Sequence, residues 1–83
     1  MTIQQANDIK KLLKGSYDYY FKSKTGELRV RVFRWDYDYK SDIEHDAIIK
    51  LLNTVSAAGY RPRFHVDRKK YQQGLNETFV VFE

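Results

Sequence analysis

The chain contains no cysteine, only one proline and only four glycines among its 83 residues. The lack of cysteine excludes a disulfide framework, a thiolate zinc site and a cysteine nucleophile. With so little proline and glycine, and with 42% hydrophobic residues, the composition differs from that of disordered or linker-dominated chains. We therefore expect one small globular domain that spans residues 1–83.

Long apolar runs are also missing, since no stretch approaches the roughly 18 residues that a membrane-spanning helix needs. The first residues show no basic region followed by an apolar core, so no secretory signal is expected. These absences predict a cytoplasmic protein without membrane contacts, in a bacterium or in a phage-infected host cell.

Two kinds of residue are abundant, namely charged residues and aromatic residues. Lysine and arginine exceed aspartate and glutamate by four, and the signs are segregated along the chain. Residues 1–34 and 47–83 are basic, whereas residues 35–46 are acidic. Aromatic residues make up 16% of the chain, and seven of them are tyrosines, which are enriched where a surface meets a partner. This pattern predicts surfaces of opposite potential.

Two amphipathic helices are predicted from periodicity and capping patterns. Thr2 and Gln5 form a T-x-x-Q capping box before an apolar stripe, which predicts a helix over residues 3–14. Ser41 and Glu44 form an S-x-x-E box before a broader apolar face that ends at Gly59, which predicts the second helix.

The remaining segments alternate in the way that half-buried strands do. Residues 17–22 and 28–32 flank the turn at 23–26, and the parity of the large residues changes after Val32. That change indicates either a bulge or a strand covered on both faces. Residues 60–67 are predicted to form an edge strand, because Pro62 has no N–H to donate to a neighbouring strand. Residues 68–76 are predicted to form a basic loop, and the apolar run at 78–82 predicts a central strand.

The order of these elements predicts an α+β fold, an αββαββ two-layer sandwich. In this arrangement both helices pack on one face of a four-stranded, mainly antiparallel sheet. Alternation then assigns basic and aromatic residues to the opposite face of the sheet. They are Tyr20, Lys22, Arg29, Arg31, Phe33, Trp35, Arg61, Arg63 and His65, with Arg68, Lys69 and Lys70 extending the positive field.

Such a face suits nucleic acid, either DNA or RNA. Guanidinium groups neutralise phosphates and release counterions, and aromatic rings stack on unpaired bases. The sequence therefore predicts a small regulatory or accessory factor that binds nucleic acid without catalysis. Ordinary solvation and cross-strand ion pairs are the alternative explanation for the same arginines, and Phe33 and Trp35 belong to the core if a bulge precedes them.

A protein partner is the second hypothesis. The acidic segment with its rings, Trp35, Asp36, Tyr37, Asp38 and Tyr39, resembles a phosphate run in charge and suits a basic groove on a protein target. A small inhibitor or adaptor of the phage or mobile-element type would use this segment or the aromatic face. A homodimer that packs sheet to sheet would also cover the last, continuously apolar strand.

Catalytic and metal-binding patterns are absent, and we expect no cofactor. The histidines, His45 and His65, lie on different predicted elements, and consecutive helical residues such as 44–46 diverge too far to bind one ion. One enzymatic alternative is a small metal-independent ribonuclease that uses His65 with Arg61, Arg63 and Tyr20.

Overall fold

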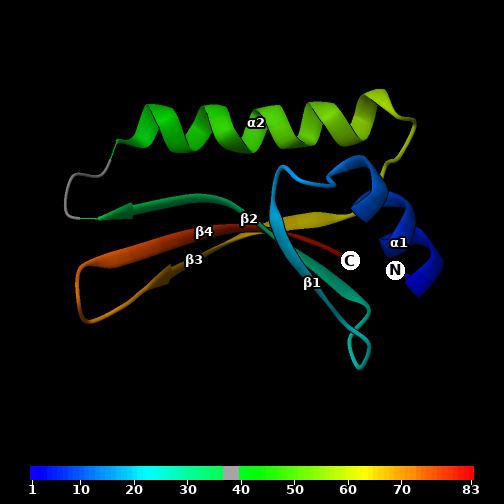
Figure 1. The fold of residues 1–83 in the computed structure, drawn as a ribbon, viewed down its shortest axis with the longest axis horizontal. Helices are drawn as coiled ribbons and strands as arrows, with labels where there is room; N and C mark the ends of the chain where they lie inside the picture. The colour runs from blue at the N-terminus through cyan, green and yellow to red at the C-terminus, as the bar shows by residue number, and fades with distance from the viewer. Residues whose placement is uncertain (37–39) are drawn as a thin grey trace.

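The computed structural model describes residues 1–36 and 40–83 (Figure 1). In chain order the elements are α1 (Ile3–Leu12), β1 (Asp18–Lys22), β2 (Glu27–Asp36), α2 (Ser41–Ala57), β3 (Phe64–Lys70) and β4 (Leu75–Phe82). The four strands form one open antiparallel sheet in the order β1-β2-β4-β3. The predicted α+β class and the αββαββ order are therefore confirmed.

Both helices contribute to a single hydrophobic core on one face of the sheet. In Figure 1, α2 runs along one side of the sheet, and α1 lies beside β1. The core combines apolar residues of both helices with the inward residues of the central strands: Ala6, Ile9, Leu13, Ile48, Leu51, Val55, Leu28, Val30, Val80 and Phe82. The opposite face of the sheet carries no helix in the part of the chain that the structure describes.

The first helix begins as its sequence predicts. The Thr2 hydroxyl accepts a hydrogen bond from the Gln5 N–H, and the Gln5 side chain accepts one from the Thr2 N–H, so the capping box is confirmed. Helix α1 ends at Leu12, two residues earlier than expected. Within the ranges 1–36 and 40–83, neither helix has the length and apolar character needed to cross a membrane.

The predicted capping box of the second helix is wrong. Lys40 occupies the N-cap position without a side-chain capping bond, and Ser41 is the first helical residue. The Glu44 carboxylate turns inward instead, because Arg68 of β3 reaches it with nitrogen–oxygen distances of 2.6 and 2.7 Å. Only 2% of Glu44 is exposed, so this ion pair anchors the start of α2 to the edge strand.

A bulge in β2 decides which side chains face the helices. The register between β2 and β4 shifts between Arg31 and Phe33, so Val32 has no partner across the ladder. An extra residue in one strand reverses the facing of all residues beyond it. Phe33 therefore pairs with Thr78, on the same side as the core residue Val80.

The second hairpin is longer than its sequence predicts. Strand β3 runs from Phe64 to Lys70 rather than over the predicted 60–67, so Pro62 lies before the strand, and the segment predicted as a loop pairs with β4 over much of its length. Only a short turn with Gly74 at a positive φ connects the two strands. The predictions that β3 is an edge strand and β4 a central one are both confirmed.

Candidate nucleic-acid interface

The open face of the sheet, defined by the ladder register, is the candidate site. Directly paired residues share a face, so the residues opposite the core follow from the pairing. They are Asp18, Tyr20 and Lys22 of β1; Glu27, Arg29, Arg31, Arg34 and Asp36 of β2; Leu75, Glu77, Phe79 and Val81 of β4; and His65, Asp67 and Lys69 of β3. Lysines and arginines equal aspartates and glutamates in number, so the strands give this face no net charge.

Arg29 is the best-buried cation of the open face, with 7% of its surface exposed. It donates to the Asp67 carboxylate, and its guanidinium carbon lies 5.2 Å from the centre of the Phe79 ring. This hydrogen bond holds the pKa of Asp67 below its usual range, although partial burial of the carboxyl opposes the shift. Arg29 thus stabilises the sheet by covering Phe79 and pairing β2 with the edge strand.

Arg31 is held in place by two carboxylates. It forms an ion pair with Asp18 of β1 and donates to Glu77 of β4 over 3.1 Å. Arg29 and Arg31, the two arginines of β2 that were predicted to contact phosphates, are therefore both paired with carboxylates of this chain. Less of their positive charge is left for a phosphate. His65 is likewise on the open face, with its Nδ1 2.9 Å from the Glu83 carboxylate.

We expect Asp67→Asn to lower the free energy of unfolding at neutral pH by about 2 kcal/mol, because a nearly buried guanidinium then loses its closest carboxylate. The pKa of Asp67 is lower in the folded chain than the ordinary 3.8, so its contribution is complete above that value and is lost as the pH falls through the folded pKa. The difference between Asp67→Asn and the original chain should therefore shrink in acid.

Urea unfolding followed by circular dichroism at about pH 7 and about pH 3 measures this difference. Asp46→Asn is the matched control, because Asp46 is exposed on α2 and has no ion pair among the described residues. A difference for Asp67→Asn that stays constant between the two pH values would contradict this assignment.

Two tyrosine rings remain exposed on this side of the sheet. Tyr20 of β1 is 49% exposed, and Tyr71, which directly follows β3, is 46% exposed. Burial first, and then the nearby Glu77 carboxylate, raise the pKa of Tyr71, and the Tyr20 phenol and the Arg29 guanidinium are also within electrostatic reach. The Tyr71 N–H donates to the Leu75 carbonyl over 2.9 Å, which continues the pairing of β3 with β4, and Leu75 is an open-face residue, so both rings border the same surface. The sequence prediction contained Tyr20 but missed Tyr71, which it placed in a loop.

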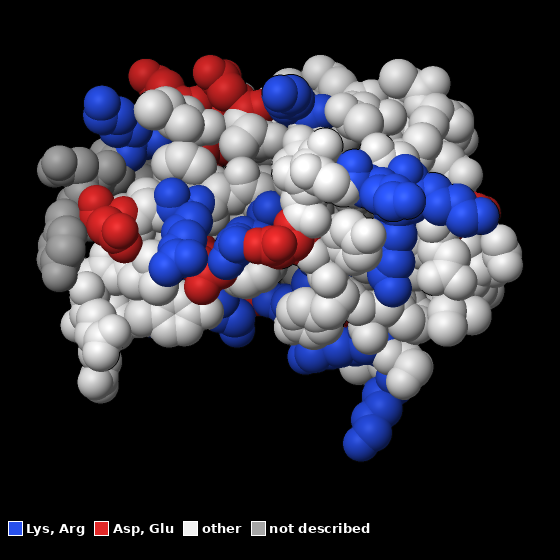
Figure 2. Space-filling model, viewed as in Figure 1, with Lys and Arg blue, Asp and Glu red and all other residues white. Residues whose placement is uncertain are grey.

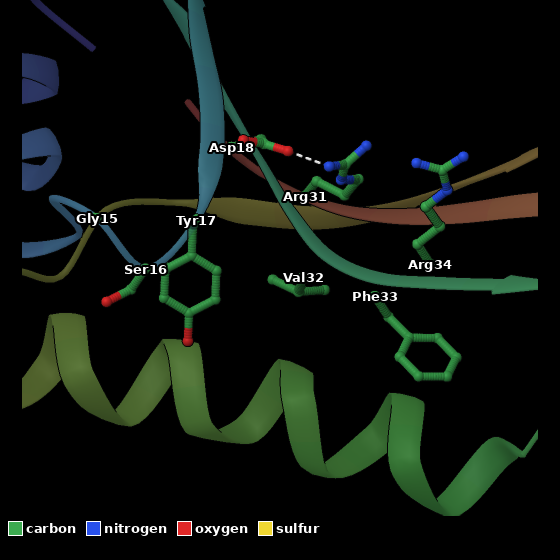
Figure 3. A pocket seen from close by; sticks show the side chains of 8 residues that line it. All are labelled: Gly15, Ser16, Tyr17, Asp18, Arg31, Val32, Phe33 and Arg34. Atoms are coloured by element: carbon green, nitrogen blue, oxygen red, sulfur yellow. Dashed lines mark hydrogen bonds and ion pairs between the residues drawn. The ribbon is translucent and has the colours of Figure 1, made fainter.

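The predicted placement of several residues is wrong. Phe33 and Trp35 face the helix side, because the bulge at Val32 reverses them and pairs them with Thr78 and Asn76. Figure 3 shows Phe33 and Tyr17 pointing toward α2. Arg68 and Lys70 also share the helix side, since their partners in β4 are Thr78 and Asn76.

Arg61 and Arg63 were predicted to lie on the open face, but both precede β3 and lie outside the sheet. Arg61 folds back on the end of α2, where it donates to the Ser56 carbonyl over 2.9 Å and to the Ser56 hydroxyl over 2.6 Å. Arg63 is exposed, and its carbonyl accepts the Glu83 N–H. Only Tyr20, Lys22, Arg29, Arg31, His65 and Lys69 of the predicted set are brought together on the open face.

Over residues 1–36 and 40–83, several cations have no carboxylate partner, and they lie on the open face and at its β1 margin. On the face itself they are Lys22 and Arg34, and Arg34 was not among the predicted residues. At the margin are Lys10 and Lys11 of α1, Lys14 of the turn after α1, and Lys24 of the turn between β1 and β2. Figure 2 shows positive side chains over α1 and near the β1–β2 turn, negative ones over the start of α2, and both signs side by side over the strands. The predicted segregation of charge is therefore visible only at α1 and the β1–β2 turn.

The acidic segment is only partly described. Trp35 is half-buried on the helix side, and Asp36 is exposed at the end of β2, whereas Tyr37, Asp38 and Tyr39 lie outside the described residues. Over residues 1–36 and 40–83, no group of three histidine, aspartate or glutamate side chains is arranged to hold a metal ion.

Comparisons with protein families, with curated proteins and with solved structures find no match to this chain. The assignment of a function therefore depends on the geometry and charge of the chain itself.

Proposed function

We propose that the protein binds single-stranded nucleic acid across the open face of its sheet and acts by binding rather than by catalysis. The observation that supports the proposal is the pair of exposed rings, Tyr20 and Tyr71, on a sheet face that no described helix covers. Exposed rings on a sheet are platforms for unpaired bases of any sequence. A small regulatory or accessory factor is the corresponding biological role.

Phosphate contacts come from cations that have no carboxylate partner in the described part of the chain. Lys22 and Arg34 are on the face, and the lysines of α1 and of the turns on either side of β1 continue the positive potential past the β1 margin. Arg29 serves a different purpose in this proposal, because it is nearly buried and its ion pair with Asp67 helps to hold the surface rigid. A rigid surface loses little entropy when it binds.

A single strand fits this surface better than a duplex. The described helices pack on the other side of the sheet, and the longer one, α2, has a single lysine, Lys50, and no arginine, so α2 does not match the negative charge of a major groove. Stacking also requires unpaired bases, because duplex bases already stack on each other.

Fluorescence anisotropy with labelled oligonucleotides of about 12 nucleotides, single- and double-stranded, tests the proposal directly. We expect the single strand to bind more tightly than the duplex, and its affinity to fall with salt with a logarithmic slope of about −3, as about four phosphate contacts would give. Failure of every oligonucleotide to bind at about 20 mM salt would overturn the proposal.

A protein partner is the second candidate, and the outer surface of α2 favours it. Ile43 and Ile49 are both exposed there, and Asp42 and Asp46 are exposed beside them. Apolar side chains within an acidic surface suit a basic protein. If the oligonucleotides do not bind, this helix surface is the remaining candidate interface.

A further inference from the structure

The bulge in β2 also creates a hollow on the molecular surface. Without the bulge, residues 31 and 34 would face opposite sides of the sheet, but the extra residue at Val32 turns both arginines to the open side. Arg31 and Arg34 line a cavity of about 420 Å³ together with Gly15, Ser16 and Asp18 (Figure 3). In the figure, both guanidinium groups point away from α2, on the same side of the strand.

The hollow exists because β1 is shorter than β2. Strand β1 begins at Asp18, whose partner is Arg31, so the described chain places no strand beside β2 from Val32 to Asp36 on this side. The preceding turn at Gly15–Ser16 forms the far wall. An unpaired edge exposes backbone N–H and C=O groups, so the hollow offers polar groups from the main chain as well as from the arginines.

The chemistry of this hollow selects an anion. Arg34 has no carboxylate partner among residues 1–36 and 40–83, whereas Arg31 is held in a fixed orientation by Asp18 and Glu77. A planar guanidinium donates two parallel hydrogen bonds to a phosphate, and a second, prepositioned guanidinium loses little freedom on binding. The volume lies within the range of small-ligand sites.

We propose that the hollow between Gly15–Ser16 and the β2 bulge binds a phosphate group, with Arg34 as the principal contact and Arg31 as the second. This inference rests on the proposed function insofar as the phosphate belongs to a nucleic acid. A phosphodiester, a terminal phosphate and free phosphate share the same chemistry, and the experiment separates these sources.

The experiment compares Arg34→Gln with Lys70→Gln, which removes an exposed positive charge from the helix side of β3, at the other edge of the sheet from the hollow. We expect Arg34→Gln to weaken binding of a single-stranded oligonucleotide about fivefold and Lys70→Gln to leave it within about twofold. Asp18→Asn should strengthen binding, because it removes a negative charge from the hollow while Glu77 still holds Arg31. Pairs of oligonucleotides with and without a 5′-phosphate distinguish a terminal phosphate from a phosphodiester.

A titration with inorganic phosphate, followed by amide chemical shifts, supplies the second measurement. Saturable shifts at Gly15, Ser16 and Arg34 that disappear in Arg34→Gln support the site even if no oligonucleotide binds, in which case the proposed function fails alone. Equal effects of Arg34→Gln and Lys70→Gln on an oligonucleotide that does bind would overturn the phosphate site in the hollow and leave the proposed function standing. Absence of both oligonucleotide binding and phosphate shifts would overturn both.

Discussion

Replacement of Arg68 with methionine is expected to lower the free energy of unfolding by about 3 kcal/mol. The Glu44 carboxylate is almost completely buried beneath α2, and two nitrogens of Arg68 lie within 2.7 Å of its Oε1. Removing one partner of such a pair leaves a buried charge without that compensation, which costs more than the pair itself contributes. Because more than half of the Arg68 side chain is exposed, the loss should be at the lower end of the range for buried pairs.

Lys69→Met is the matched control for this prediction. Lys69 is adjacent in sequence and similarly exposed, but it faces the open side, and its Nζ lies 3.5 Å from Asp67. An exposed ion pair contributes little, so we expect a loss of about 0.5 kcal/mol at most. Urea unfolding followed by circular dichroism measures both variants.

A double replacement separates lost charge pairing from lost packing. Glu44→Leu in the Arg68→Met background removes the buried carboxylate and should restore most of the stability, because an apolar pair needs no compensation. Equal losses in Arg68→Met and Lys69→Met, or no recovery in the double variant, would show that the Glu44–Arg68 pair does not anchor α2.

The Glu44–Arg68 pair also illustrates what the sequence predicts poorly. Glu44 stands at the third position after Ser41, where an S-x-x-E pattern ordinarily caps a helix, and local rules favour that interpretation. Instead, the Glu44 carboxylate pairs with Arg68, which lies 24 residues away in β3. Such a contact depends on strand order and register, and one sequence does not determine either of them.

The fold itself was predictable because the helix and strand patterns of the individual segments agree with the way in which the whole chain packs. The apolar stripes of residues 3–12 and 41–57, the Thr2–Gln5 box and the alternation of residues 28–30 all favour the elements that form. The continuous apolar run at 78–82 likewise predicted the central strand, whereas β3 is an edge strand although Pro62, on which that prediction depended, lies before it.

The candidate site was predictable only up to the bulge. The side chains of β1, and those of β2 before Val32, lie on the face of the sheet that alternation predicts. Those of Phe33, Arg34 and Trp35 lie on the opposite face from the predicted one. The sequence does carry a signal of the bulge, because the large residues change from even to odd positions after Val32. A bulge placed there would have predicted Arg34 on the open face, and Phe33 and Trp35 on the helix side. Tyr71 had no comparable signal, because its place depends on how far β3 continues.

The largest effect on binding is expected from Tyr20→Leu combined with Tyr71→Leu. Each leucine keeps an apolar side chain of similar reach but removes the ring face on which a base stacks. A base stacked on an aromatic ring contributes about 1–3 kcal/mol, so each single variant should weaken single-strand binding about tenfold and the double variant about 100-fold.

Phe64→Leu provides the control on the same sheet. Phe64 is 48% exposed, close to the value for each tyrosine, but it shares the helix side with Phe82 and packs edge-on against that ring. If the open face alone binds bases, loss of the Phe64 ring should change the affinity by less than about twofold, provided that the variant remains folded by circular dichroism.

Rings of similar exposure on the two faces of the sheet are thus expected to differ in their effect on affinity. A loss with Phe64→Leu as large as with the tyrosine variants would mean that the affinity reflects general aromatic exposure rather than a defined surface. An affinity that survives the double tyrosine variant, with its salt slope unchanged, would assign binding to the lysines and Arg34 alone. Anisotropy at two salt concentrations distinguishes these outcomes, because loss of stacking lowers the affinity without changing the slope, whereas loss of a phosphate contact lowers both.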